Sequence, residues 1–280
     1  MLSAVKLIDP RANYRALREF ATAVRRYREL VLEMTRRDIL DRYAGQILGG
    51  LWAIGNPLLL MAVYVFAFTF LFRSRLGPGG TSAEYTVYLL AGLAPWVALQ
   101  ETLGRAPSGV VANANLVKQI VFPSEILPLK IALGALPTLL VSLLVAIVFG
   151  LTAGVARPLA WLLLPPVIAC HLLMTAGLSY LLAAIGVFVR DIKDVVSLLL
   201  SIGLFLHPIL YRPDAVPHAV EIAFHLSPLS YLIWCYRDAI FYGAITQPAA
   251  WMALPFISVA LFALGYRVFR TLRPTFGNAL

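Results

Sequence analysis

Residues 51–72 read LWAIGNPLLLMAVYVFAFTFLF, and the polar interruptions in this stretch are Asn56 and Thr69. At about 1.5 Å per residue, a helix of this length crosses a hydrocarbon core roughly 30 Å thick. The stretch begins too late in the chain for a signal peptide, is too long, and lacks the small-residue cleavage site that such a peptide needs. It therefore predicts a transmembrane helix.

The whole chain shares this apolar character. Of its 280 residues, 60% are hydrophobic and 13% are charged, and the mean hydropathy is +0.82. Soluble domains have about 45–50% apolar and about 25% charged residues. The composition predicts an integral membrane protein and excludes a soluble enzyme, a disordered tail and a secreted disulfide scaffold. The two cysteines, Cys170 and Cys235, lack the spacing of a metal or redox site.

Further apolar blocks cover about residues 85–99, 126–153, 161–189, 195–211 and 249–269. Residues 213–243 are less apolar and could form either a seventh span or a pair of short re-entrant helices. With six spans and a cytoplasmic N-terminus, 18 of the 23 Lys and Arg residues lie on the cytoplasmic side, as the positive-inside rule requires. A seventh span would send Arg267, Arg270 and Arg273 outside. We therefore expect an all-α membrane protein with six transmembrane helices, an outer re-entrant pair between spans five and six, and both ends in the cytoplasm.

The first 50 residues form a basic arm ahead of the transmembrane domain, which we place at residues 51–280. Apolar side chains recur in this arm at helical spacing, namely Leu17, Phe20, Val24, Tyr27, Val31 and Met34. This pattern predicts an amphipathic helix, with Glu33–Arg37 and Asp38–Arg42 as i,i+4 ion pairs. Such a helix can lie in the membrane interface as an anchor, help to seat a cytoplasmic partner, or do both.

The sequence contains no catalytic constellation. None of the four lysines follows a glycine, so the chain lacks the phosphate-binding loop of ATPases, and no G-x-S-x-G elbow is present. His218, Glu221 and His225 share one helical face but are too few for a convincing metal site. We expect them to form the wet face of a re-entrant helix, and we predict no metal site. Glu101 ends the second span, but no series of carboxylates crosses the membrane as a proton-coupled carrier would require.

Several motifs, taken in order, resemble the membrane subunits of ABC-2 type polysaccharide exporters, the family of O-antigen, capsule and teichoic-acid permeases. RYAGQILGGLW at residues 42–52 is similar to the family's R-Y-x-x-S-x-L-G-x-x-W, although Gln46 replaces a small residue. NANLVKQIVFPSEILP at residues 113–128 contains F-P-x-E-x-L-P, the most specific match. The series continues with FVRDI at residues 188–192 and HPILY at residues 207–211. It ends with SPL at residues 227–229, followed by Arg237, and here Ser227 stands in place of the usual Asn.

This resemblance implies a permease that moves a lipid-linked polysaccharide out of the cytoplasm across the bacterial inner membrane. Two copies would work with two copies of a separate ATP-binding subunit, which would carry the ATP and Mg, so this chain needs no cofactor of its own. Periplasmic and outer-membrane export proteins are further candidate partners. Nucleic acid is not expected as a partner, because the net charge of +9 is explained by topology.

The resemblance also implies roles for particular segments. The segment around residues 113–125 would couple to the ATPase through Asn113, Asn115, Leu116, Lys118, Gln119, Phe122, Pro123 and Glu125. Arg190 and Asp191 would form a cytoplasmic loop. The re-entrant helices would gate the exit, with His218, Glu221, His225 and Arg237 as gate residues.

Aromatic side chains are candidates for a polymer path, because their faces stack on the C–H-rich faces of sugars. The candidates are Tyr64, Phe68, Phe72, Phe205 and Tyr211. Aromatic residues are also common in lipid-facing and packing stripes. Two other functions therefore stay open: an ABC-2 permease for a small lipid or drug, and a membrane scaffold that transports nothing.

Overall fold

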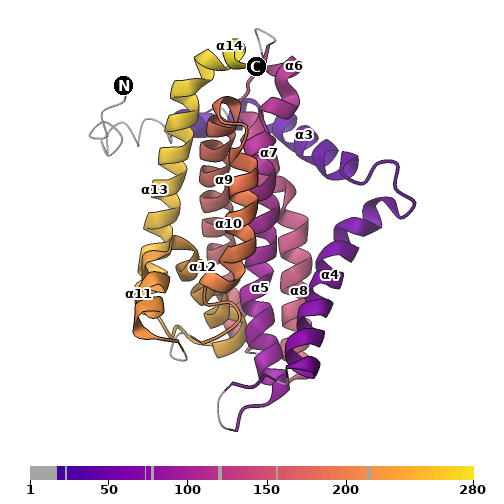
Figure 1. Ribbon diagram of the computed structural model, residues 1–280, viewed down its shortest axis with the longest axis vertical. Coiled ribbons are helices and arrows are strands. Elements are labelled where there is room, and N and C mark those ends of the chain that lie inside the picture. Colours follow the sequence, from indigo (N-terminus) through magenta and orange to yellow (C-terminus); the bar gives the residue numbers. More distant parts are fainter. Residues whose placement is uncertain are drawn as a thin grey trace.

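The computed structural model describes residues 18–22, 24–72, 74–76, 79–118, 122–155, 157–212 and 216–280. These residues contain helices and connecting turns and no strand, which confirms the all-α class. The long helices run up and down one bundle (Figure 1): α4 (Trp52–Val65), α5 (Ser82–Arg105), α7 (Ile126–Gly134), α8 (Leu136–Thr152), α9 (Leu164–Phe188), α10 (Ile192–Leu206) and α13 (Pro248–Leu272). The shorter helices are α3 (Arg28–Asp41), α6 (Ala114–Val117), α11 (His218–Leu226), α12 (Pro228–Arg237) and α14 (Phe276–Ala279).

Four helical stretches are long and apolar enough to cross a membrane, and they cover residues 49–71, 126–152, 158–188 and 248–279. Two further helices run along the bundle where spans were expected. α5 has 24 residues and includes Glu84, Gln100 and Glu101, whereas α10 has only 15 residues. The expectation of six spans therefore rests on these two helices in addition to the four.

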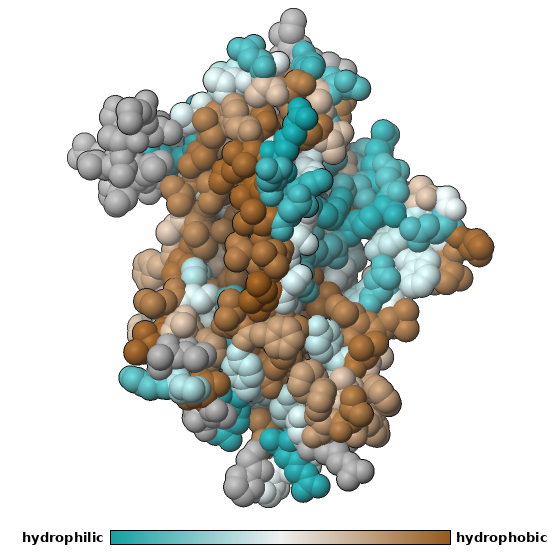
Figure 2. Space-filling model, in the orientation of Figure 1, coloured by the Kyte–Doolittle hydropathy of each residue, from teal (hydrophilic) through white to brown (hydrophobic). Residues whose placement is uncertain are grey.

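α5 forms the centre of the bundle. Every residue from Tyr85 to Leu99 is buried, and α4, α8, α9, α10 and α12 all contact this helix. A helix that is apolar on all sides belongs inside a bundle rather than at its surface. The exposed faces of α4 and α10 are apolar as well, and Figure 2 shows extended hydrophobic surface over the bundle, as expected for a protein that sits in lipid.

Two of the expected spans are interrupted. Span three breaks at Ala135 into α7 and α8, and Pro137 lies in the first turn of α8. Span five was expected to reach residue 211, but α10 ends at Leu206. Pro208 lacks the backbone N–H that the helix would need, so residues 207–211 form a turn.

The bundle has two distinct ends (Figure 1). α3, α6, α14 and the turn between α9 and α10 lie at one, which we call the α3 end, and α11 and α12 lie at the other, the α12 end. Residues 18–22 and 24–26 are helical and precede α3, so the predicted helical arm is present; Leu17 lies outside the described residues. Its apolar face packs on the bundle, since the Phe20 ring lies 4.6 Å from the ring of Phe262 and Val31 is buried.

Candidate functional site

Five charged side chains form a cluster at the α3 end. The guanidinium of Arg105 donates from Nη2 to both carboxylate oxygens of Asp38, at 2.8 and 2.7 Å. Arg42 donates to Asp38 at 3.2 Å and also pairs with Glu101. The ammonium of Lys130 lies 3.9 Å from Asp38 Oδ1, which is an ion-pair distance longer than a hydrogen bond. Three cations therefore surround two carboxylates, and the nearby carboxylate of Asp41, which interacts with Lys130, balances the charge.

Local helix geometry and one glycine explain how this cluster forms. Asp38 and Arg42 are four residues apart at the end of α3, so they share one helical face, and Glu101 and Arg105 have the same spacing on α5. Arg42 also donates to the carbonyl of Gly134, at 3.2 Å. A Cβ at Gly134 would lie 3.0 Å from Arg42 Nη2 and 3.1 Å from Asp38 Oδ2. The missing side chain thus leaves room for the ion pairs.

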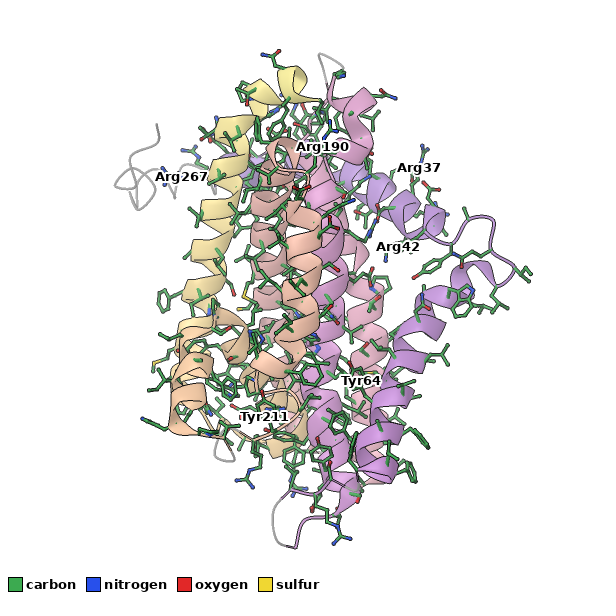
Figure 3. All side chains as sticks on the ribbon, viewed as in Figure 1. Arg37, Arg42, Tyr64, Arg190, Tyr211 and Arg267 are labelled. Carbon is green, nitrogen blue, oxygen red and sulfur yellow. The ribbon has the colours of Figure 1, made fainter. Side chains whose placement is uncertain are left out.

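The cluster faces an open cavity of about 570 Å³, which we call the α3 pocket. Its charged lining comprises Arg37, Asp38, Asp41, Arg42, Arg105 and Lys130, and its uncharged lining comprises Leu30, Met34, Asn113, Leu116 and Phe122. A second cavity of about 380 Å³ lies between the start of α4 and the bundle, and Arg42 lines both. Figure 3 shows Arg42 in the angle between α3 and α4, and Figure 2 shows hydrophilic surface gathered at this end.

The segment expected to couple to the ATPase also lies at the α3 end. Asn113 ends a short 3-10 turn (Val111–Asn113), α6 follows as a single helical turn, and Asn115 and Lys118 are exposed. Asn113 and Leu116 are half-buried and line the α3 pocket. Gln119 lies outside the described residues.

The other residues named for this segment are Phe122, Pro123 and Glu125, and Glu125 contacts residues far from it in the chain. The Glu125 carboxylate pairs with Arg273, and the Tyr180 hydroxyl donates to the Glu125 carbonyl at 2.6 Å. Pro123 is half-buried beside Glu125, and Phe122 lines the α3 pocket. Glu125 therefore joins the segment to the C-terminal residues. Arg190 and Asp191 are exposed in the turn between α9 and α10, at the same end of the bundle (Figure 3).

At the α12 end, the turn at residues 207–211 is held by side chains from two helices. Tyr85 and Tyr88 of α5 donate to the carbonyls of Leu210 and Tyr211, at 2.7 and 3.2 Å. Arg237 of α12 donates to the carbonyl of Ile209 at 2.7 Å. Side chains of α5 and α12 therefore satisfy the carbonyls of three consecutive residues of this turn, Ile209, Leu210 and Tyr211.

His207 joins the end of α10 to the start of α12. Its Nδ1 lies 2.7 Å from the carbonyl of Gly203, and its Nε2 lies 2.8 Å from Ser227 Oγ. The Trp96 ring lies 5.1 Å from the His207 ring. Ser227, which stands in place of the usual Asn of the resembled motif, therefore takes part in the contact between these two helices.

The structure locates the gate residues in two different environments. Arg237 is 1% exposed, and its guanidinium carbon lies 3.6 Å from the centre of the Tyr88 ring. Unlike the exposed His218 and His225 of α11, its side chain is buried and anchors α12 to α5. His218 is exposed and contacts Glu221 at 3.2 Å, as their spacing predicts, while the exposed His225 has its ring 4.9 Å from that of Trp234.

The aromatic candidates for a polymer path fall into two groups. Tyr64, Phe68 and Phe72 form a ladder on α4 and its π-helical continuation (Phe66–Leu71), with ring centres 6.4 and 5.5 Å apart. Tyr211 stacks on Phe224 at 5.9 Å, and Phe205 is exposed on α10. Tyr85 of α5 lies between the two groups, because its ring is 6.3 Å from that of Phe68 and its hydroxyl donates to the carbonyl of Leu210, the residue before Tyr211. Figure 3 shows Tyr64 and Tyr211 at the same end of the bundle.

Comparison with known proteins agrees with this architecture. The chain is 29% identical over 256 residues to the O-antigen export system permease protein RfbA of Myxococcus xanthus, a match that covers 91% of this chain and 96% of the relative. It is also 29% identical over 253 residues to the protein of the same name from Klebsiella pneumoniae, with 90% and 95% covered. Residues 29–241 match the ABC-2 type transporter family, so the chain belongs to that family of transporter membrane proteins.

Proposed function

We propose that this chain is the permease subunit of an ATP-driven exporter that moves an O-antigen-type, lipid-linked polysaccharide across the bacterial inner membrane. The likeness to O-antigen export permeases over nine-tenths of the chain carries this proposal. The four long apolar helices agree with a multi-pass protein of that membrane. In the finer arrangement that we propose, α5 and α10 are the two remaining spans, the α3 end is cytoplasmic, and α11 and α12 are re-entrant from outside.

The energy for transport would come from two copies of a separate ATP-binding subunit. In this arrangement the exposed face of α6, with Asn115 and Lys118, receives that partner, and the exposed loop at Arg190 and Asp191 extends the docking surface. Movement of the α6 segment would reach the bundle through Glu125, because this residue contacts Arg273 and directly precedes α7.

The polymer path would require a second copy of the chain. The two aromatic groups belong to different helices, and in this arrangement α4 of one copy approaches α10 of another so that both groups face one passage. Tyr64, Phe68, Phe72, Phe205 and Tyr211 would then offer ring faces to the passing sugars. His218, Glu221 and His225 would line the outer mouth, while Arg237 holds α12 in place.

The test is a deletion of this chain in its own host. We expect lipid-linked polysaccharide to accumulate on the cytoplasmic side and surface polysaccharide to disappear, and the wild-type chain to restore export. Purified alone, the chain should not hydrolyse ATP, and hydrolysis should appear when the ATP-binding subunit is added. If the deleted strain kept its normal surface polysaccharide but no longer exported a small lipid or drug, the alternative of an ABC-2 permease for that small molecule would be favoured.

Cysteine accessibility separates the exporter from a scaffold. Single cysteines at Tyr64, Phe68 and Phe72, in a chain whose Cys170 and Cys235 are replaced by alanine, should react with a water-soluble reagent in the absence of polymer and be protected when polymer is present. Leu59 and Val63 are exposed apolar residues of α4. In the proposed arrangement they face lipid, so cysteines at these two positions serve as controls and should stay unreactive. An unreactive ladder at all three aromatic positions would favour the scaffold.

A further inference from the structure

Residues 273–280 fold back on the α3 end of the bundle. α13 ends at Leu272, and a 3-10 turn (Arg273–Thr275) and α14 follow it. Figure 1 shows α14 at the same end of the bundle as α6, and Figure 3 shows Arg190 at that end as well. A helical turn of four residues is not stable by itself, so tertiary contacts must hold this segment in place.

The first contact joins residues 273–280 to the end of the coupling segment, by which we mean residues 113–125. Arg273 pairs with the carboxylate of Glu125, and the two side chains are 40% and 16% exposed. An ion pair that is partly shielded from water is screened less by salt than a fully exposed one. The backbone of Glu125 is held too, because the Tyr180 hydroxyl of α9 donates to its carbonyl at 2.6 Å. The end of the coupling segment is therefore fixed to α9 through its backbone and to Arg273 through its side chain.

The second contact joins residues 273–280 to the end of α9. The Phe276 side chain is fully buried, and its ring centre lies 6.1 Å from that of Phe188 and 5.2 Å from that of Phe269 in α13. Aromatic rings at such distances pack favourably. Phe188 is the last residue of α9, and Arg190 follows two positions later in the exposed loop. Phe276 therefore joins the start of this loop to α13.

One short segment thus contacts both elements of the proposed docking surface. We propose that residues 273–280 brace this surface, with Arg273 and Phe276 as positioning residues that keep the coupling segment and the loop at Arg190 and Asp191 in a fixed relation. A partner that displaces one element then moves the other with it, because the two are linked through the same eight residues. The proposal rests on the proposed function in treating these elements as the surface that receives the ATP-binding subunit.

The first test measures the distance between the two elements in the full-length chain alone. Spin labels are attached to cysteines placed at the exposed positions Asn115 and Lys193, in a chain whose Cys170 and Cys235 are replaced by alanine. Pulsed electron paramagnetic resonance should give one narrow distance distribution. R273E should broaden this distribution, since a carboxylate at position 273 repels Glu125, and removal of residues 273–280 should broaden it at least as much. An unchanged distribution in either chain would overturn the brace.

Two matched variants separate the ion pair from a general loss of folding. E125R/R273E exchanges the two charges and should restore the narrow distribution, whereas a distribution as broad as that of R273E would overturn the role of the pair. R36E reverses a charge at an exposed position of α3, outside these contacts, and should leave the distribution unchanged. Broadening in R36E as well would show a general effect of charge reversal and would overturn the assignment to Arg273.

The second test adds the ATP-binding subunit to the unlabelled chain. R273E should change the affinity for that subunit by less than about twofold but reduce the stimulated ATP hydrolysis about fivefold, which is the lower end of typical coupling between sites. The exchanged pair should recover the stimulation. Normal stimulation in R273E would overturn the brace, and loss of binding would make Arg273 a docking contact and overturn its positioning role. If the wild-type chain does not bind the subunit, the proposed docking surface fails, while the distance measurements on the chain alone still decide the brace.

Discussion

Replacement of Gly177 by alanine tests the closest helix contact in the bundle. α9 and α13 meet there with backbone against backbone, and Gly265 of α13 lies against the carbonyl of Gly177. A Cβ at Gly177 would lie 2.5 Å from Phe262 Cα and 2.6 Å from the Leu261 carbonyl oxygen. Real Cβ atoms essentially never come closer than 3.0 Å, so the two helices would have to separate by about half an ångström. Small residues permit such close approach between membrane helices.

The expected cost follows from two opposing effects. Overpacking costs about 1–3 kcal/mol, and the upper part of this range applies because backbone atoms cannot rotate away as a side chain can. The alanine recovers at most about 1 kcal/mol through its higher helix propensity. A net loss of about 2 kcal/mol lowers the midpoint of thermal unfolding by about 4–8 °C.

The assay is thermal unfolding of the purified chain in detergent, followed by circular dichroism. G104A is the matched control, because Gly104 also lies in a helix but is exposed and has open space around its missing Cβ. That variant should unfold at the wild-type temperature or slightly above. If G177A were as stable as G104A, the close contact between α9 and α13 would be refuted.

Three further predictions concern the two ends of the bundle. R237K should lower the unfolding temperature although it keeps the charge. The planar guanidinium of Arg237 stacks on Tyr88 and also donates to the Ile209 carbonyl, and a lysine ammonium cannot do both. A melting curve like that of the wild type would contradict the anchor role. S227A should cost about 1 kcal/mol of stability through loss of the hydrogen bond to His207, as measured by the same melting assay, and an equal loss in a background without the His207 imidazole would argue against that bond. K118E should leave the unfolding temperature unchanged, because Lys118 is exposed, and should reduce binding of the ATP-binding subunit and its stimulated hydrolysis; unaltered stimulation would remove α6 from the coupling surface.

Local features of this protein were predictable from the sequence because they depend on near neighbours in the chain. The apolar runs predicted the helices that now form the bundle, and the Glu33–Arg37 and Asp38–Arg42 pairs are both present, at 2.8 and 3.2 Å. The pair of short helices between spans five and six was also expected, and α11 and α12 occupy that segment. Proline chemistry could have indicated that α10 ends before Pro208.

The site depended on contacts between distant parts of the chain. Glu101 was identified as a charged residue at the end of a span, but nothing in the order of residues brings Asp38, Arg105 and Lys130 to it. Arg237 was expected among the gate residues, and only the packing of α12 on α5 shows that it is buried under Tyr88.

The sequence by itself determined the class of protein, its apolar helices and its family resemblance, because hydropathy and motif order are properties of neighbouring residues. The tertiary structure alone decided which charges meet. Ion pairs in a low-dielectric environment are set by distances of a few ångströms, and residues separated by up to 92 positions reach those distances only when α3, α5 and α7 pack together. For the same reason, the α3 pocket and the buried Arg237 became visible only in the folded chain.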